Sequence, residues 1–398
     1  MKPIRVFITL TYYRPHYSGL TIYVERLARA LAQRGHWVTI LTSRYDWHLP
    51  KFAVIDGVQI WRLNTWLRIS KGVIMPAMPF RAWQLARQAD IVNLHVPQLD
   101  AALVSVLARL LKKPVVLTYH CDLKLPKGAI HALANQASHL ANHIAARMAN
   151  VIVTNTRDYA EHSSFLGQYL SKVHIIPPPI EVAAVTPEMV TDFKHKAGIQ
   201  PGQRLIGMAA RLAAEKGVEF LVAAMPEILE RHPQARVLFV GQYQDVLGEE
   251  AYIRRLRPMI DRLGEHWTFL GVLPPGEFAA FLKVAEVTVL PSINSTESYG
   301  MVQVESMTSG TPVVATDLPG VRQPIQTSGM GRIVPVGDSS SLAKAISEIL
   351  ENPHRYPNNA ELVAERHSSE TVSAEYETLF RELLNKASRS EKVSTNNV

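Results

Sequence analysis

The alternation of short apolar runs with amphipathic helical segments constrains the fold of this 398-residue chain most strongly. It begins with the apolar run 4–10 and the helical pattern 21–35, which ends at a glycine. Four more apolar runs follow before residue 180: WVTILTS, ADIVNLH, PVVLTYH and ANVIVTNT. Continuous apolar runs between helices are typical of parallel strands that are buried on both faces. The pattern therefore predicts a doubly wound α/β sheet.

Three consecutive prolines, residues 177–179, interrupt this alternation and predict a stiff connector. The alternation then restarts with the strand-like run 204–211 and continues to residue 292. We predict two Rossmann-like domains, residues 1–180 and 181–370, facing a common cleft. Residues 371–398 are expected to form a helix that crosses back to the first domain, followed by a polar tail. Ligands of such sheets bind beyond the carboxyl ends of the strands.

Charge is distributed unevenly along the chain. Residues 1–185 carry 21 Lys and Arg against 9 Asp and Glu, whereas the rest carries 21 against 26. The first half is therefore expected to face something anionic, but not nucleic acid. The single cysteine, Cys121, excludes an internal disulfide and fits a reducing compartment. Neither a signal peptide nor an apolar run of membrane-spanning length is visible, so we expect a cytoplasmic protein that is soluble or peripheral to the membrane.

The stretch ESYGMVQVESMTSGTPVVATDLPG places Glu297 and Glu305 eight positions apart. If a helix begins near Tyr299 or Gly300, its first backbone N–H groups have no intrahelical partner and can bind a phosphate. Glu305 could face the same ligand and accept hydrogen bonds from sugar hydroxyls. The alternative is that Glu297 caps the helix and Glu305 is a solvated surface charge.

Further candidate residues follow predicted strands. Gly19, after Ser18, offers a second phosphate cradle, although glycine is common in turns. His120 ends a strand and could donate a proton, bind a hydroxyl or satisfy the backbone. Arg211 and Lys216 lie between a strand and a helix, where they could neutralise a leaving diphosphate or form a solvated basic loop. The sequence lacks an Asp-x-Asp pair, a zinc-type His/Cys cluster and a Walker loop, so we expect neither a metal nor a cofactor.

Several of these segments together resemble the retaining glycosyltransferases of family 4, which have the GT-B fold. ESYGMVQVESMTSGTPVVA is similar to the family's E-x-F-G-x-x-x-x-E-A-M-A-x-G-x-P-V-V-A segment, and AARLAAEKG to its G-R-x-x-x-x-K-G segment. FLGVLPPGEFAAFLKVAEVTVLPS and PHYSGLTIYVERLARALAQRGHWVTILT resemble its base-side and amino-terminal segments. The resemblance covers nearly the whole chain in the same order.

The resemblance implies an enzyme that moves a hexose from a nucleotide sugar, bound mainly to the second domain, to an acceptor bound mainly to the first. It implies retention at the anomeric carbon, with the leaving diphosphate accepting the acceptor's proton. The implied roles are diphosphate binding by Arg211, Lys216 and the backbone at Tyr299, Gly300, Met301 and Val302; sugar binding by Glu297 and His120; ribose binding by Glu305; base contact by Leu273; and donor-phosphate contact by Gly19.

Two positions of the amino-terminal segment depart from the family pattern, as do the three prolines 177–179, where Pro-Asn-Gly is usual. Ser18 stands where the first loop usually has a glycine, and Thr21 where it usually has an acidic residue. A donor-binding protein without activity is therefore an alternative, as is a nucleotide-sugar epimerase of similar architecture.

Residues 64–88 combine apolar and cationic side chains. The apolar ones are Trp66, Leu67, Ile69, Val73, Ile74, Met75, Phe80 and Trp83, and the cations are Arg68, Lys71, Arg81 and Arg87. This mixture suggests docking on an anionic membrane surface, where a lipid-linked acceptor would wait; a glycan acceptor is also open. The alternative is an ordinary core helix whose cations reach solvent.

Overall fold

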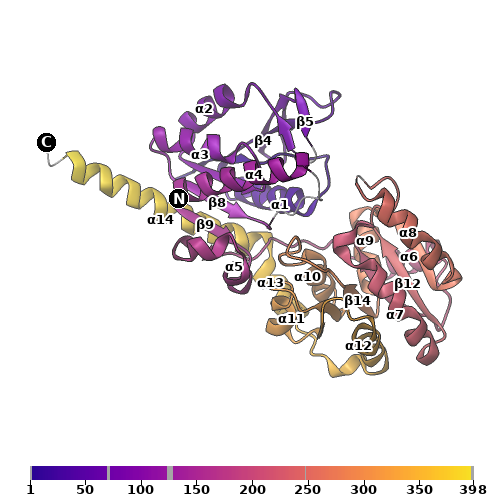
Figure 1. The fold of residues 1–398 in the computed structure, drawn as a ribbon. Coiled ribbons are helices and arrows are strands. Elements are labelled where there is room, and N and C mark those ends of the chain that lie inside the picture. The colour runs from indigo at the N-terminus through magenta and orange to yellow at the C-terminus, as the bar shows by residue number, and fades with distance from the viewer. Residues whose placement is uncertain (1, 70–71, 123–128, 247, 396–398) are drawn as a thin grey trace. The chain divides into compact units, whose positions relative to one another are not determined.

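The computed structural model describes residues 2–69, 72–122, 129–246 and 248–395. Its contacts divide the chain into two compact units. Unit 1 comprises Met1–Pro179 and His367–Val398, and unit 2 comprises Ile180–Arg366 (Figure 1). Each unit has one mainly parallel sheet covered by helices on both faces. This confirms the predicted pair of doubly wound α/β domains.

The sheet of unit 1 has eight strands in the order β10-β9-β8-β7-β1-β2-β4-β3. Only the β3–β4 pair is antiparallel. The central strands are buried on both faces, as in β7, where every residue is buried. The bounds are β1 Arg5–Thr9, β2 Trp37–Arg44, β3 Phe52–Ile55, β4 Val58–Asn64, β7 Ile91–Val96, β8 Val115–Tyr119, β9 Val151–Thr154 and β10 Val173–Ile175.

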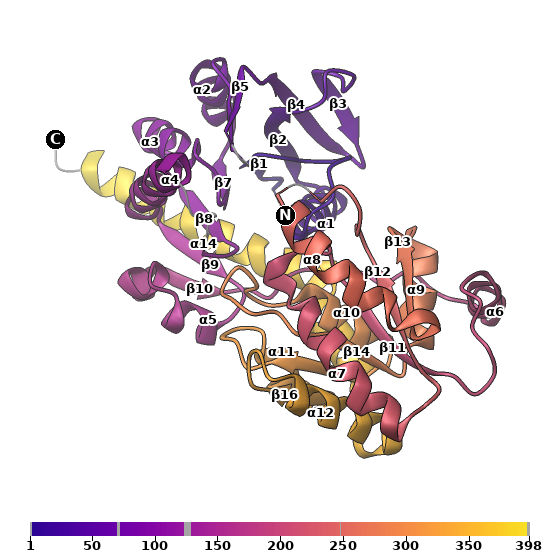
Figure 2. The same cartoon turned by 45° about the vertical axis from the view of Figure 1, so that its right-hand side comes forward.

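Two sets of helices cover the two faces of this sheet. The apolar sides of α2, α3, α4 and α5 pack on one face, and those of α1 and α14 pack on the other (Figure 2). The C-terminal helix α14 therefore belongs to unit 1, as predicted. The bounds are α1 Gly19–Gln33, α2 Met78–Gln88, α3 Ala101–Leu110, α4 Ala129–Met148, α5 Arg157–His162, η1 Leu166–Lys172 and α14 Ser369–Thr395.

The segment 64–88 is not one core helix, so that alternative is wrong. Its first part forms a two-stranded antiparallel ribbon of β5 (Leu67–Ile69) and β6 (Gly72–Ile74), and only α2 is helical. Lys71 lies outside the described residues. Several large apolar side chains of this segment are exposed to solvent, whereas Val73 and Met75 are buried.

Unit 2 has a six-stranded parallel sheet in the order β13-β12-β11-β14-β15-β16. Helices α7, α8 and α12 pack on one face, and α6, α9, α10 and α11 on the other. The strands are β11 Arg204–Ala209, β12 Ala235–Val240, β13 Trp267–Gly271, β14 Val287–Leu290, β15 Val313–Thr316 and β16 Gly331–Val334. The helices are α6 Pro187–Lys196, η2 Ala214–Lys216, α7 Val218–Arg231, α8 Glu250–Asp261, η3 Gly264–His266, α9 Pro275–Val284, α10 Met301–Thr308, α11 Gln323–Ser328, α12 Ser339–Glu351, η4 Pro353–Arg355 and α13 Ala360–His367.

Candidate active site

The loop after β11 carries the two predicted cations of unit 2. Arg211 Nη2 lies 2.9 Å from a carboxylate oxygen of Glu215, and 44% of the Arg211 side chain is exposed. Lys216 ends the short helix η2, and its Nζ lies 2.7 Å from Glu297 Oε2. Lys216 and Glu297 are therefore brought together, although they are 81 positions apart in the chain.

Gly217 holds the loop after β11 against the loop after β14. It has a φ of +63°, and a Cβ there would lie 2.0 Å from the carbonyl oxygen of Pro291. The Ile293 N–H donates to the Glu215 carbonyl at 3.1 Å and joins the same two loops. Only glycine fits both the backbone conformation and this close approach. The contact of the two loops places Lys216 beside Glu297.

Glu297 lies in the loop between β14 and α10. Its Oε2 accepts hydrogen bonds from Lys216 Nζ and from Ser292 Oγ, the latter at 3.4 Å. Its side chain is only 15% exposed. These two hydrogen bonds hold the carboxylate in place, and it neutralises the ammonium group of Lys216.

The helix predicted near Tyr299 or Gly300 begins at Met301, and Gly300 is its N-cap residue. The φ of Gly300 is +76°, and a Cβ there would lie 2.2 Å from Leu290 Cδ2. No side chain caps this helix start. Tyr299 is buried, whereas Met301 and Val302 are half-buried. The start of α10 therefore has the geometry that suits an anion at a helix N-terminus.

Glu305 lies in α10 and is 7% exposed. The alternative that it is a solvated surface charge is therefore wrong. A carboxylate this far from water requires polar partners, because burial of an unpaired charge is costly. Leu273, expected near the base, lies between β13 and α9, half-buried against the apolar cluster of α6 and α9.

In unit 1, the first loop leads directly into α1, with Gly19 as the first helical residue. Ser18 is the N-cap, and its Oγ accepts a hydrogen bond from the Thr21 N–H at 3.2 Å. Thr21 Oγ1 donates to the Tyr12 carbonyl at 3.2 Å. The residues at the two amino-terminal positions that depart from the family pattern therefore have local structural roles. Ser18 caps α1, and Thr21 connects α1 to the preceding loop by a hydrogen bond.

His120 directly follows β8 and contacts a second histidine that sequence reasoning missed. His120 Nε2 lies 3.0 Å from Nδ1 of His95, which is fully buried in β7. Burial lowers the pKa of His120 to about 3 and that of His95 well below its usual value. Both imidazoles are therefore neutral at physiological pH. The available signal was Asn93 and His95 at alternate positions in an otherwise apolar strand.

Asp100 is a second residue that was missed. It follows β7 in the chain and is the N-cap residue of α3, without a side-chain cap hydrogen bond. Burial raises the pKa of its carboxyl group to about 6. It is therefore a titratable group near the carboxyl end of a strand adjacent to β8.

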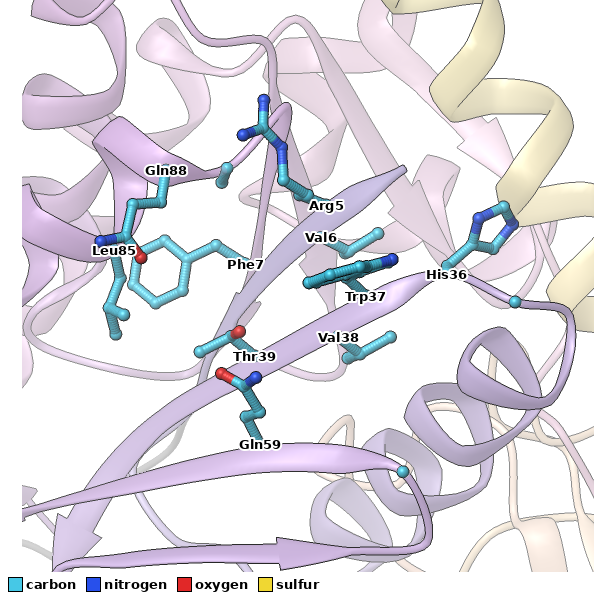
Figure 3. A pocket seen from close by; sticks show the side chains of 13 residues that line it. Arg5, Val6, Phe7, His36, Trp37, Val38, Thr39, Gln59, Leu85 and Gln88 are labelled. Carbon is cyan, nitrogen blue, oxygen red and sulfur yellow. The ribbon is translucent and has the colours of Figure 1, made fainter. Parts of the chain in front are cut away.

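A pocket of about 530 Å³ lies at the opposite, amino-terminal end of the unit 1 strands. Figure 3 shows Arg5, Trp37 and Gln59 around it, on β1, β2 and β4. Arg5 is already paired with Asp90 at 2.6 Å. This pocket contains none of the predicted site residues.

Among the residues that the structure describes, no three His, Cys, Asp or Glu side chains cluster in a way that could hold a metal ion. Among the described helices, none is both long enough and apolar enough to cross a bilayer.

Two units, each with a mainly parallel sheet covered by helices on both faces, have the architecture of the GT-B glycosyltransferases. Family models agree: "Glycosyl transferase 4-like domain" matches residues 18–179 and "Glycosyl transferases group 1" matches residues 189–365. The chain belongs to the group 1 glycosyltransferases, which confirms the resemblance and the enzyme class.

Relatives and solved structures match nearly the whole chain. This chain is 25% identical to an uncharacterized glycosyltransferase of Methanocaldococcus jannaschii, over 92% of this chain and 94% of that one. It is 27% identical to the phosphatidyl-myo-inositol mannosyltransferase of Mycolicibacterium smegmatis, over 91% and 90%. The crystal structure of HepE from Anabaena in complex with UDP has the same fold, with a TM-score of 0.75, 16% identity and coverage of 95% and 100%.

Proposed function

We propose that this glycosyltransferase moves a hexose from a nucleoside-diphosphate sugar to a lipid-linked or glycan acceptor, with retention of the anomeric configuration. The observation that supports this most is the pairing of Lys216 with Glu297, which lies in the loop that leads into α10; Arg211 lies in the same loop as Lys216 and is paired with Glu215. An ammonium group already 2.7 Å from a carboxylate can exchange that partner for a diphosphate oxygen. The UDP complex of HepE supports a nucleoside-diphosphate donor, and the mannosyltransferase relative supports the transfer of a hexose.

The chemical step follows from where charge develops. The bond between the sugar C1 and the diphosphate oxygen breaks, and a bond from C1 to the acceptor oxygen forms on the same face of the sugar. The acceptor's proton passes to the departing diphosphate. Arg211, Lys216 and the N–H groups at the start of α10 stabilise the negative charge on the diphosphate. Glu297, once released by Lys216, accepts hydrogen bonds from hydroxyls of the transferred sugar.

We assign the neutralising role to side chains and helix N–H groups, so the transfer is proposed to need neither a metal ion nor a cofactor. Glu305 is assigned to the ribose, Leu273 to the base, and Gly19 to the donor phosphate. The test is a panel of UDP-, GDP- and ADP-sugars, with membrane extract as acceptor and mass spectrometry as readout. We expect transfer from one of them to persist in EDTA, and the anomeric coupling constant of the product to match that of the donor.

Other outcomes of this panel would contradict the proposal. Conversion of one donor into its epimer without an acceptor would make the protein an epimerase. Binding of a nucleotide sugar without transfer or hydrolysis would make it a non-catalytic binding protein. Loss of activity in EDTA, with recovery on addition of a divalent cation, would overturn the metal-independent step.

We further propose that unit 1 docks on an anionic membrane from the cytoplasmic side, where a lipid-linked acceptor is presented for envelope glycan or glycolipid synthesis. The apolar side chains available for this are large and exposed: Trp66 at 77%, Phe80 at 68%, Leu67 at 47% and Trp83 at 39%. Arg68 and Arg87 are exposed in the same segment. Large apolar side chains beside cations suit the interface of an anionic bilayer, and the charge balance of residues 1–185 adds to the attraction.

Sedimentation with vesicles tests this docking. We expect the full chain to bind vesicles rich in phosphatidylglycerol at low salt, and Phe80→Ser/Trp83→Ser to weaken binding about tenfold, since each loses buried apolar area. Leu362→Ser, at an exposed leucine of unit 2, is the matched control. No sedimentation with these vesicles at low salt would end the membrane proposal and leave the donor chemistry unaffected.

A further inference from the structure

A chain of hydrogen bonds inside unit 1 connects His120 to helices α1 and α14. His120 Nε2 contacts His95 Nδ1 at 3.0 Å, and His95 Nε2 contacts Asn93 Nδ2 at 3.1 Å. Thr118 Oγ1 donates to Asn93 Oδ1 at 3.0 Å and lies 3.1 Å from the hydroxyl of Tyr376. That hydroxyl lies 2.9 Å from the hydroxyl of Tyr23. The chain therefore crosses the sheet interior, from α1 and α14 through β8 and β7 to the loop after β8.

Every member of this chain except His120 is almost completely buried. The two tyrosines, one on α1 and one on α14, are 353 positions apart in sequence. Burial of so many polar groups is costly unless each one is hydrogen-bonded. An apolar interior would have held α14 more simply, so the polar chain requires an explanation other than packing.

The direction of each hydrogen bond in this series, from donor to acceptor, can be derived from the groups involved. Thr118 has one hydroxyl proton and gives it to the carbonyl of Asn93, so Tyr376 must donate to Thr118, and Tyr23 to Tyr376. The Asn93 amide nitrogen can only donate, so His95 Nε2 accepts. A neutral His95 then carries its proton on Nδ1 and donates it to His120 Nε2. The remaining proton of His120 must therefore sit on Nδ1.

We infer that Asn93, His95, Thr118 and Tyr376 are positioning residues that hold His120 as the neutral Nδ1–H tautomer. In this state Nε2 of His120 is occupied and Nδ1 can only donate. The inference deepens the proposed function and rests on it for its catalytic meaning. A histidine held in this way gives a hydrogen bond to a hydroxyl of the bound sugar and is not the base that removes the acceptor's proton. This agrees with a mechanism in which the diphosphate takes that proton.

The surroundings of His120 favour the neutral form. The titratable members of the hydrogen-bond chain, besides His120, are Tyr23 from α1, Tyr376 from α14 and His95 from β7. Besides burial, the nearby Glu375 of α14 helps to raise the pKa of both tyrosines. The ring of Tyr23 stands edge-on to His120, with ring centres 4.8 Å apart. Burial raises the pKa of both tyrosines, so neither forms an anion that could stabilise an imidazolium. No charged side chain is a member of this hydrogen-bond chain.

Two substitutions test the direction of the chain. Asn93→Asp has nearly the same shape but only acceptor oxygens, so His95 must then donate from Nε2 and can no longer donate from Nδ1 unless it is charged. Nε2 of His120 must then donate to Nδ1 of His95, so a neutral His120 carries its proton on Nε2 instead of Nδ1. Tyr376→Phe removes one hydroxyl at the far end, in a helix that follows unit 2 in the chain, and leaves the imidazoles in place. Tyr252→Phe removes a buried, hydrogen-bonded hydroxyl of unit 2 and is the matched control.

The primary measurement is the ¹⁵N spectrum of the full chain labelled at its 15 histidines, with His120 assigned by the spectrum of His120→Asn. We expect an unprotonated Nε2 and a protonated Nδ1 for His120 from pH 6 to pH 8. In Asn93→Asp the signal should move to the other tautomer or to the imidazolium. A protonated Nε2 in the wild type, or an imidazolium in this range, would overturn the inference whether or not the protein is a transferase.

Kinetics with the donor found by the panel provide the second readout. We expect kcat to fall about tenfold in Asn93→Asp and two- to threefold in Tyr376→Phe, while the Kd of the nucleoside diphosphate alone stays the same because unit 2 binds it. Circular dichroism and thermal unfolding establish that each variant is folded. An equal loss in Tyr252→Phe, or unchanged kcat in a folded Asn93→Asp, would contradict the positioning role. Absence of transfer by the wild type would refute the proposed function but leave the spectroscopic result intact.

Discussion

In unit 2, the loops after β11 and β14 hold a guanidinium, an ammonium and a carboxylate that are partly open to solvent. In unit 1, His120 ends a chain of neutral hydroxyl, amide and imidazole groups inside the protein. The arrangement in unit 2 suits a ligand that is negatively charged and becomes more so during the reaction. The arrangement in unit 1 suits an uncharged ligand that offers hydroxyl groups. Under the proposed function, anion stabilisation is therefore assigned to unit 2 and neutral hydrogen bonding to unit 1.

The largest effect is expected from the cations. Lys216→Ala and Arg211→Ala should each lower kcat/KM by about 10³-fold, because each removes a charge aimed at the departing diphosphate. Initial rates with the preferred donor measure this, and thermal unfolding shows that the variants fold. Arg255→Ala is the control, since it removes an exposed arginine of the same unit. Near-normal turnover by both variants would show that these two cations do not stabilise the departing diphosphate.

The next effect concerns the glycine that joins the two loops of unit 2. Gly217→Ala places a Cβ 2.0 Å from a backbone oxygen and should lower the free energy of unfolding by about 2–4 kcal/mol. It should also weaken binding of a nucleoside diphosphate, because Lys216 and Glu297 move apart. Denaturant titration and calorimetry measure the two effects.

Gly198→Ala is the control for this substitution. Gly198 also has a positive φ, +60°, but a Cβ there meets nothing within 4 Å, so only about 1 kcal/mol should be lost. An equal loss of unfolding free energy in the two variants would mean that the close contact between the two loops does not contribute to stability.

A smaller effect is expected in the pH profile. The pKa of His120, about 3, lies below its usual value, so His120 should contribute no inflection to kcat/KM between pH 5 and pH 8. Its contribution to stability is complete above about pH 6.5 and is lost as the pH falls towards 3, because the unfolded chain binds the proton more readily. An inflection near pH 6 would come from Asp100 and disappear in Asp100→Asn. An inflection that disappears only in His120→Asn would contradict the neutral role.

The smallest effect concerns the docking of α14 on unit 1. Glu377 accepts hydrogen bonds from Arg381 and Arg34. Burial alone would raise its pKa, but these bonds and the nearby His36 lower it to about 2. Its contribution to stability is therefore complete above about pH 4.5 and is lost as the pH falls towards 2.

Glu377→Gln should therefore cost about 1–2 kcal/mol at pH 7 and leave kcat within a factor of two. Urea unfolding at pH 7 and near pH 2 measures the difference. A penalty that is equally large at both pH values would show that the carboxylate charge is not involved.

The sequence predicted the fold class and the helix start at Gly300 because both depend on local patterns. Strand-like runs and glycine positions report on the conformation of a few neighbouring residues. Pairings between distant loops do not follow from such patterns. The bond from Lys216 to Glu297 and the burial of Glu305 come from the way the loops after β11 and β14 pack.

His95 was missed for a similar reason. A histidine in an apolar strand is compatible with any hydrogen-bonded core position. The importance of His95 depends on Thr118 and His120, from β8 and the loop after it, and on Tyr376 from α14. The ribbon of β5 and β6 was also unexpected, because residues 64–88 were considered only as a membrane-docking surface or as a core helix.

The most direct test of the central claim is calorimetric titration of UDP, GDP and ADP in EDTA, into the wild type and into Arg211→Ala/Lys216→Ala. The account predicts that one nucleoside diphosphate binds the wild type at a single site without a metal, and that the double variant, still folded, binds it at least 10²-fold more weakly. Equal affinity of the two proteins, or no binding of any of the three nucleotides by the wild type, would contradict it.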